Sequence, residues 1–66
     1  MQIYINGQEQ VWSEGGTLAV LVDKFDLNIR KIAIELNLAI VPRSLYDETI
    51  LCDGDKIEIV QFIGGG

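Results

Sequence analysis

Hydrophobic residues occupy every second position in several short stretches of the chain, a pattern that predicts β-strands. The first stretch is residues 2–5, where isoleucine alternates with glutamine and tyrosine. Asn6-Gly7 comes next, and this dipeptide favours the positive φ angles of a tight hairpin turn. We therefore predict that the chain reverses here and returns as a second strand over residues 9–13.

A different spacing follows, in which apolar side chains recur every three or four positions. The apolar residues of this segment are Leu18, Leu21, Val22 and Phe25. They would share one face of an α-helix, and Thr17 stands where an N-cap is expected. The spacing predicts one amphipathic helix of about eight to ten residues whose apolar face packs on the strands.

Alternation returns in residues 31–36 and again in residues 56–62, so each is predicted to be a strand. A short strand over residues 39–41 is expected between them, and Pro42 ends it because proline cannot donate to a sheet ladder. Residues 43–49 are expected to be irregular or to hold a short helical turn.

This order of elements predicts an α+β domain over residues 1–63. If the last strand pairs in parallel with the first at the centre of the sheet, and the helix crosses one face, the result is a β-grasp, or ubiquitin-like, architecture. Such a fold has a mixed sheet of four to five strands over one main helix. The pattern alone leaves other α+β arrangements open.

Composition is that of a small cytoplasmic protein. The chain has 66 residues, 48% of them hydrophobic, which is enough for one core without staples. Its single cysteine, Cys52, permits no internal disulfide, so a reducing compartment fits. The chain begins directly with a strand pattern and contains no apolar stretch of membrane-spanning length, so we expect a mature soluble protein.

The net charge of −5 argues against nucleic acid or an anionic membrane as partner, because binding either requires Lys and Arg to neutralise phosphate. An acidic surface suits docking to a basic face of another protein, and it equally suits solubility alone.

Catalytic and metal-binding groups are sparse in this sequence. The chain has no histidine, the usual general base and metal ligand. Asp53 and Asp55 flank a glycine, but a cation needs more oxygen ligands, so a turn with solvated carboxylates is expected. Cys52, beside Ile50 and Leu51, is expected to be a small strand residue, with a redox role as the alternative. We predict no metal site and no bound cofactor.

The chain ends in three glycines, Gly64, Gly65 and Gly66, directly after the last predicted strand. Glycine has no side chain to bury and loses the most backbone entropy on ordering, so residues 64–66 are predicted to form a mobile tail. Such a stalk can pass through a narrow channel and deliver the carboxylate of Gly66 to a partner's active site. The alternative is a frayed end without function.

Strand alternation also predicts a docking surface beside this tail. If Ile57 and Ile59 face the core, Val60 and Phe62 face outward, and with Ile63 they form an apolar partner-binding surface. A bulge that turns one of them inward remains the alternative.

Ile40-Val-Pro-Arg43, Asp53-Gly-Asp55 and the Gly-Gly end together resemble the sulfur carrier protein family of thiamin biosynthesis, whose members are small and ubiquitin-like. The resemblance spans the whole chain. The Gly-Gly end by itself is shared by several ubiquitin-like families, whereas the combination at this length is more specific. This chain departs from the family pattern by a third glycine, Gly64, which lengthens the stalk.

The resemblance implies a protein co-substrate and not an enzyme. An adenylating, E1-like partner would use ATP to convert the carboxylate of Gly66 into an acyl adenylate. A sulfur-donor protein would then supply persulfide sulfur, leaving a thiocarboxylate on Gly66. Thiazole synthase would accept that sulfur to build the thiazole ring of thiamin.

Other functions remain open at this stage. The small subunit of molybdopterin synthase carries the same terminal thiocarboxylate on a similar fold. A ubiquitin-like protein modifier would join Gly66 to lysines through an isopeptide bond. A bare interaction module would make no use of its tail.

Overall fold

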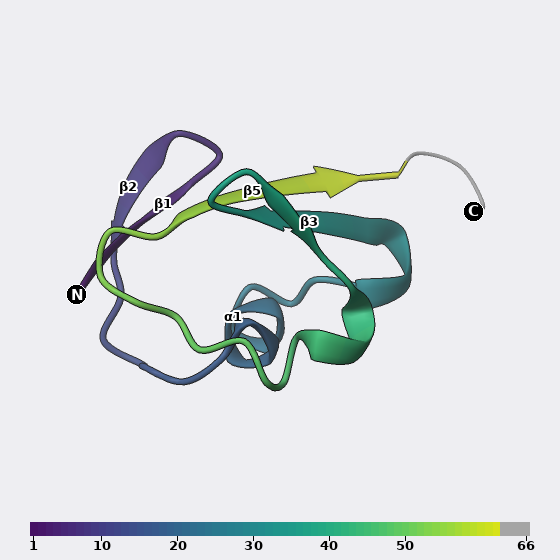
Figure 1. The fold of residues 1–66 in the computed structure, drawn as a ribbon, viewed down its shortest axis with the longest axis horizontal. Coiled ribbons are helices and arrows are strands. Elements are labelled where there is room, and N and C mark those ends of the chain that lie inside the picture. The colour runs from purple at the N-terminus through teal and green to yellow at the C-terminus, as the bar shows by residue number, and fades with distance from the viewer. Residues whose placement is uncertain (63–66) are drawn as a thin grey trace.

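The alternating segments form a five-stranded mixed sheet that packs against one helix in the computed structural model, which describes residues 1–62 (Figure 1). The predicted tail, Gly64, Gly65 and Gly66, and the predicted contact residue Ile63 lie outside the described residues. The elements are β1 (Gln2–Ile5), β2 (Gln8–Val11), α1 (Leu18–Lys24), the 3-10 turn η1 (Ile29–Lys31), β3 (Ile32–Leu36), β4 (Ala39–Val41), the 3-10 turn η2 (Arg43–Leu45) and β5 (Lys56–Gln61).

The strand order is β2-β1-β5-β3-β4, so the last strand lies at the centre of the sheet. β5 runs parallel to β1, with Ile5 opposite Ile57, and antiparallel to β3, with Ile34 opposite Ile59. The predicted hairpin turn is present, because Asn6 and Gly7 have φ angles of 50° and 81°. The β-grasp prediction is confirmed.

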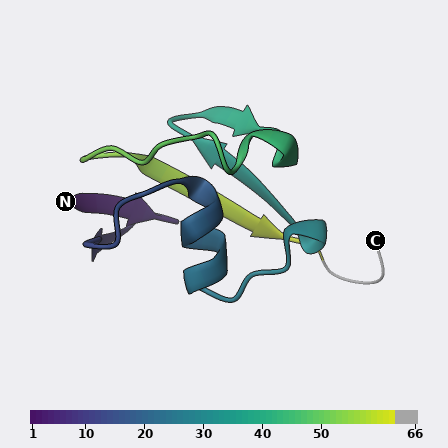
Figure 2. The same ribbon diagram turned by 90° about the horizontal axis from the view of Figure 1, so that it is seen from below.

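The core lies between the sheet and α1, which crosses one face of the sheet (Figure 2). Every second residue of the central strands points into it, and Ile3, Ile34 and Ile57 are almost fully buried. Burying one such side chain contributes about 1.5–3 kcal/mol to folding. The remaining core residues are Trp12, Leu18, Leu21, Val22, Ile32, Tyr46 and Leu51.

The helix is shorter than the apolar spacing predicts. α1 has 7 residues, and Thr17 takes the extended N-cap conformation without a side-chain hydrogen bond to the helix. Phe25 caps the C-terminal end and is exposed, stacking on Trp12 with ring centroids 6.1 Å apart. Asp26 then adopts a φ of 55°, which stops the helix. Phe25 thus packs on Trp12 directly after the last helical residue, Lys24.

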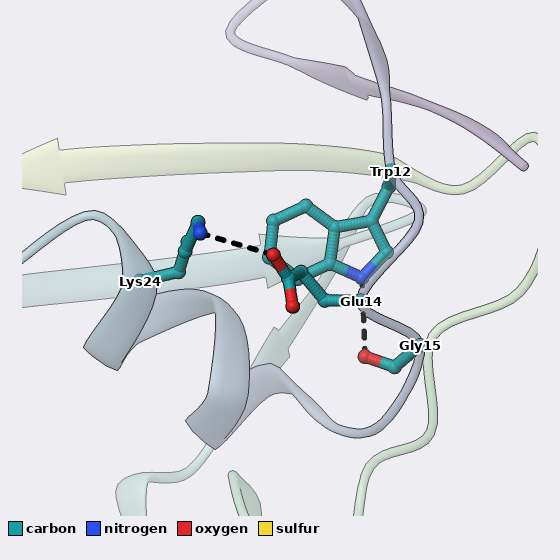
Figure 3. Close-up of polar contacts among 4 residues, drawn as sticks. All are labelled: Trp12, Glu14, Gly15 and Lys24. Carbon is teal, nitrogen blue, oxygen red and sulfur yellow. Dashed lines mark hydrogen bonds and ion pairs between the residues drawn. The ribbon is translucent and has the colours of Figure 1, made fainter.

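The loop between β2 and α1 is held by two side-chain contacts (Figure 3). The Trp12 indole Nε1–H donates to the carbonyl oxygen of Gly15 at 3.1 Å, which satisfies the one polar atom of a buried ring. Lys24 Nζ lies 3.0 Å from Glu14 Oε1, across the outside of the same loop. This exposed ion pair contributes little, whereas the indole bond orients the largest core side chain.

The Asp53-Gly54-Asp55 segment is a turn, but one of its carboxylates is not solvated, contrary to prediction. Asp55 is buried, and its Oδ1 and Oδ2 accept hydrogen bonds from Asn37 Nδ2 (3.0 Å) and the Cys52 N–H (2.8 Å). The Asn37 side chain also accepts from the Lys56 N–H at 3.0 Å. The carboxylate therefore joins the turn before β5 to the turn between β3 and β4.

The prediction for Cys52, three residues before Asp55, is also wrong. It lies outside the strands and is exposed, so it is not a strand residue. Leu51, one position earlier, takes the buried place in the core instead.

Within residues 1–62, no helix combines the length and the apolar character that crossing a membrane requires.

Replacing Asp55 with alanine should lower the free energy of unfolding by roughly 1–3 kcal/mol, because the Cys52 N–H and the Asn37 amide would lose their buried acceptor. Urea denaturation measures this change. Glu58→Ala, an exposed carboxylate on the neighbouring strand, is the control and should change stability by less than about 0.5 kcal/mol. Equal effects of the two substitutions would show that Asp55 makes no special contribution.

Candidate functional site

The predicted docking surface lies on β5 and points away from the core. Ile57 is 1% exposed and Ile59 packs against the core, whereas Val60 and Phe62 are 56% and 50% exposed. The register between β3 and β5 is continuous from Leu36–Ile57 to Ile32–Gln61, so no bulge interrupts the alternation. The alternative of an inward-turned residue is therefore wrong, and both apolar side chains face solvent.

Two further apolar residues extend this surface across the sheet. Ala33 lies directly opposite Val60 on β3, and directly paired residues share a face. Ile40 on β4 is 72% exposed, pairs with Glu35 on β3 and lies diagonal to Ala33. We call Ala33, Ile40, Val60 and Phe62 the outer patch. Ile40 was missed as a site residue, although alternation within residues 39–41 could have placed it outward.

The backbone of β5 is held on both sides just before the undescribed residues. On the β3 side, the Phe62 N–H donates to the carbonyl oxygen of Lys31 at 2.8 Å. On the β1 side, the Asn6 side chain accepts from the Ile59 N–H at 2.7 Å and donates to the Ile59 carbonyl at 3.2 Å. The amide of Asn6 thus acts as one more strand residue beyond the end of β1.

Asn6 is the positioning residue that sequence reasoning missed. The pattern identifies it only as a turn residue, because nothing local indicates a contact 53 positions away. We call the backbone of Gln61 and Phe62 the tail root. The hydrogen bond from the Phe62 N–H to the Lys31 carbonyl joins it to the end of η1.

No catalytic centre is assembled among residues 1–62. They contain no group of three or more Cys, Asp or Glu side chains placed to hold a metal ion. The Thr49 hydroxyl donates to the Leu45 carbonyl at 2.7 Å and has no base beside it in the described region. The functional features of the described part of the chain are the hydrogen-bonded tail root and the exposed outer patch.

An open groove of about 440 Å³ lies on the other side of the molecule, between α1 and η2. Tyr46 forms part of its floor, and burial raises the pKa of the Tyr46 hydroxyl while the nearby Arg43 charge opposes the rise. The hydroxyl therefore stays protonated at neutral pH, and Tyr46 serves as a packing residue.

Comparison with known proteins gives a consistent result. The ThiS family matches residues 2–66. The sulfur carrier protein ThiS of Bacillus subtilis is 37% identical over 65 residues, which cover 97% of this chain and 98% of that protein. The crystal structure of the thiamine biosynthesis protein ThiS from Geobacter metallireducens has a TM-score of 0.85 at 28% identity and covers 100% of both chains.

A longer relative also matches. A thiazole synthase of Paramagnetospirillum magneticum is 47% identical over 66 residues, which are 100% of this chain but 20% of that protein. The chain thus spans about a fifth of the length of this relative.

Replacing Phe62 with glutamate should change the free energy of unfolding by less than about 0.5 kcal/mol, because the side chain lies outside the core. Ile57→Ala, on the inward face of the same strand, should cost about 2–5 kcal/mol. Thermal and urea denaturation of both variants give the comparison. A severe loss of stability in the Phe62 variant would place that ring in the core and contradict the assigned face.

Proposed function

Because the chain belongs to the ThiS family of small sulfur carrier proteins, which are not themselves enzymes, we propose that it carries sulfur for thiamin biosynthesis on the carboxyl group of Gly66. The observation that supports this most directly is the arrangement around β5. An exposed apolar patch and a fixed tail root are followed in the sequence by Gly64, Gly65 and Gly66. The proposal requires that Gly66 has a free carboxyl group.

Activation must come from a partner, because a carboxylate is a poor electrophile. In the proposed first step, a carboxylate oxygen of Gly66 attacks the α-phosphorus of ATP, forming an acyl adenylate and releasing pyrophosphate. The adenylating, E1-like enzyme binds the ATP and the metal ions that this step needs. Residues 1–62 contribute recognition, and no side chain among them is assigned to the chemistry.

Sulfur transfer follows on the same carbonyl carbon. A persulfide of a sulfur-donor protein attacks the acyl adenylate, its terminal sulfur bonds to carbon, and AMP leaves. A second thiol then attacks the sulfur of the donor, so a disulfide forms and the thiocarboxylate of Gly66 is released. Its sulfur is anionic near neutral pH and a good nucleophile, as thiolates are.

Thiazole synthase is the proposed acceptor of this sulfur. The thiazole synthase of Paramagnetospirillum magneticum contains a region similar to the whole of this chain, so carrier-like and synthase sequences occur there in one polypeptide. We infer that this chain likewise acts together with a thiazole synthase, either as a separate protein or as part of the same polypeptide. The outer patch is the proposed contact surface, first for the activating enzyme and then for the synthase.

The position of the carboxylate tests the carrier chemistry. Deleting Gly66 moves the carboxylate back by up to ~3.6 Å, and adding one alanine after Gly66 moves it outward and adds a methyl group. A misplacement of about 1 Å can cost a hundredfold in rate, so both variants should lose at least about 99% of activity. The assay is partner-catalysed exchange of pyrophosphate into ATP. Both variants should melt at the wild-type temperature, and near-wild-type exchange by either would refute the proposal.

Intact mass after incubation with cell extract and ATP separates the competing functions. Replacement of one oxygen by sulfur supports a carrier, a ladder of heavier conjugates indicates a protein modifier, and no change indicates an interaction module. Co-purification with thiazole synthase, as opposed to the large subunit of molybdopterin synthase, then decides between the two thiocarboxylate pathways.

The outer patch can be tested with a matched pair of substitutions. Phe62→Glu should weaken binding to the activating enzyme by roughly tenfold or more, because it places a charge in a desolvated apolar contact. Val11→Glu makes the same type of change on β2, the edge strand farthest from β3 and β4, at a residue that is 79% exposed. It should leave the affinity nearly unchanged. Calorimetric titration measures both, and equal losses would show that the patch is not the contact.

A further inference from the structure

The few cations of this acidic protein are unevenly distributed. The chain has 5 Lys and Arg residues against 10 Asp and Glu. Lys24 is paired with Glu14, and Lys56 begins β5 at the far end of the sheet from the tail root. The other three, Arg30, Lys31 and Arg43, belong to the two 3-10 turns. We call these three residues the basic cluster.

Both turns lie at the end of the sheet where β5 leads toward the C-terminus (Figure 2). η1 ends at Lys31, whose carbonyl oxygen holds the Phe62 N–H at 2.8 Å, so two of the cations directly flank the tail root. η2 follows the end of β4, and its Arg43 lines the same groove as Ile29, the first residue of η1. The cluster therefore borders the point where the chain leaves the sheet.

These cations are exposed and are not neutralised within the described structure. Among residues 1–62, the only ion pair within 4.0 Å is the one between Lys24 and Glu14. Asp23 and Asp47 share the groove with Arg43 but do not reach it within that distance. Arg30 and Lys31 thus place two cations without an ion pair beside the tail root, on a molecule whose net charge is −5.

The reach of the tail brings this charge close to any partner that takes up Gly66. Four residues, 63–66, span at most about 14 Å when fully extended. A partner that binds Gly66 in its active site must therefore bring the rim of its channel within about 14 Å of the tail root, a distance comparable with the Debye length of ~10 Å at 0.1 M salt. Charges at that separation steer association and contribute to affinity.

On the basis of the proposed function, we propose that the basic cluster of Arg30, Lys31 and Arg43 binds an acidic surface around the channel of the activating enzyme. The partner's carboxylates complement the cations, while the apolar outer patch supplies the contact beside them. Three cations on an acidic chain are too few to hold a nucleic acid at physiological salt. The alternative is that the cluster binds the phosphates of ATP held by the partner. The titration with and without ATP described below distinguishes the two ligands.

The test compares Lys31→Glu with Lys56→Glu, because both reverse one exposed lysine on the same protein. Lys31 lies opposite Phe62, six residues along β5 from Lys56, so the two positions are about 20 Å apart by strand rise, beyond the Debye length at 0.1 M salt. In pyrophosphate exchange at low salt, Lys31→Glu should raise KM roughly five- to tenfold with kcat within about twofold, and Lys56→Glu should change KM by less than about twofold. Lys31→Arg should restore the wild-type KM.

Two further measurements identify the ligand. Raising the salt concentration should shrink the difference between the Lys31 and Lys56 variants, because ions screen an electrostatic contact. Calorimetric titration onto the activating enzyme without ATP should show the same fold-loss for Lys31→Glu, and a loss seen only with ATP present would assign the cluster to nucleotide phosphate and overturn the acidic-surface proposal.

Different results of the exchange assay would overturn the role of the basic cluster and the carrier function. Exchange with wild-type protein but equal KM values for the two lysine variants would overturn the role of the basic cluster alone. No exchange with wild-type protein would overturn the carrier function and this inference with it. Circular dichroism and melting temperature should match for all variants, since every substituted side chain is exposed.

Discussion

Everything in this domain depends on β5 being paired on both sides. The strand lies between β1 and β3, and its inward residues Ile57 and Ile59 complete a core that neither hairpin could close alone. Where β1 ends, the amide of Asn6 continues the pairing to Ile59. The same pairing that closes the core thus also holds β5 up to Phe62, the last described residue. The stability of the core and the position of the tail root both depend on this one arrangement of hydrogen bonds.

Local patterns predicted the elements and their faces well, because burial in a sheet imposes a period of two on each strand. The inward places of Ile34 and Ile57 and the outward places of Val60 and Phe62 all follow from that period. Features that depend on distant residues were not predictable. Nothing local indicates that Phe25 stacks on Trp12, and Asp55 is buried because its partner Asn37 comes from another turn.

The candidate site likewise has a part that local pattern predicts and a part that depends on distant residues. Its apolar part could be predicted from strand alternation, including the overlooked Ile40, whereas its polar part depends on topology. Arg30 and Arg43 are 13 positions apart in the sequence and reach the same end of the sheet only because β3 and β4 form a hairpin between them. Net charge describes the whole chain and so does not show that three of its five cations gather at one end of the sheet.

The central place of β5 also has a consequence for biosynthesis. A ribosome makes the chain from its N-terminus, so residues 56–61 appear after all the other strands of the described structure. Until then, the β1–β2 and β3–β4 hairpins have no common neighbour, and isolated two-stranded hairpins are marginally stable in water. The nascent chain therefore cannot close this core, and Ile3 and Ile34 stay exposed, until residues 56–61 have left the ribosome. During that interval these side chains lack the cover of the completed sheet and are open to aggregation.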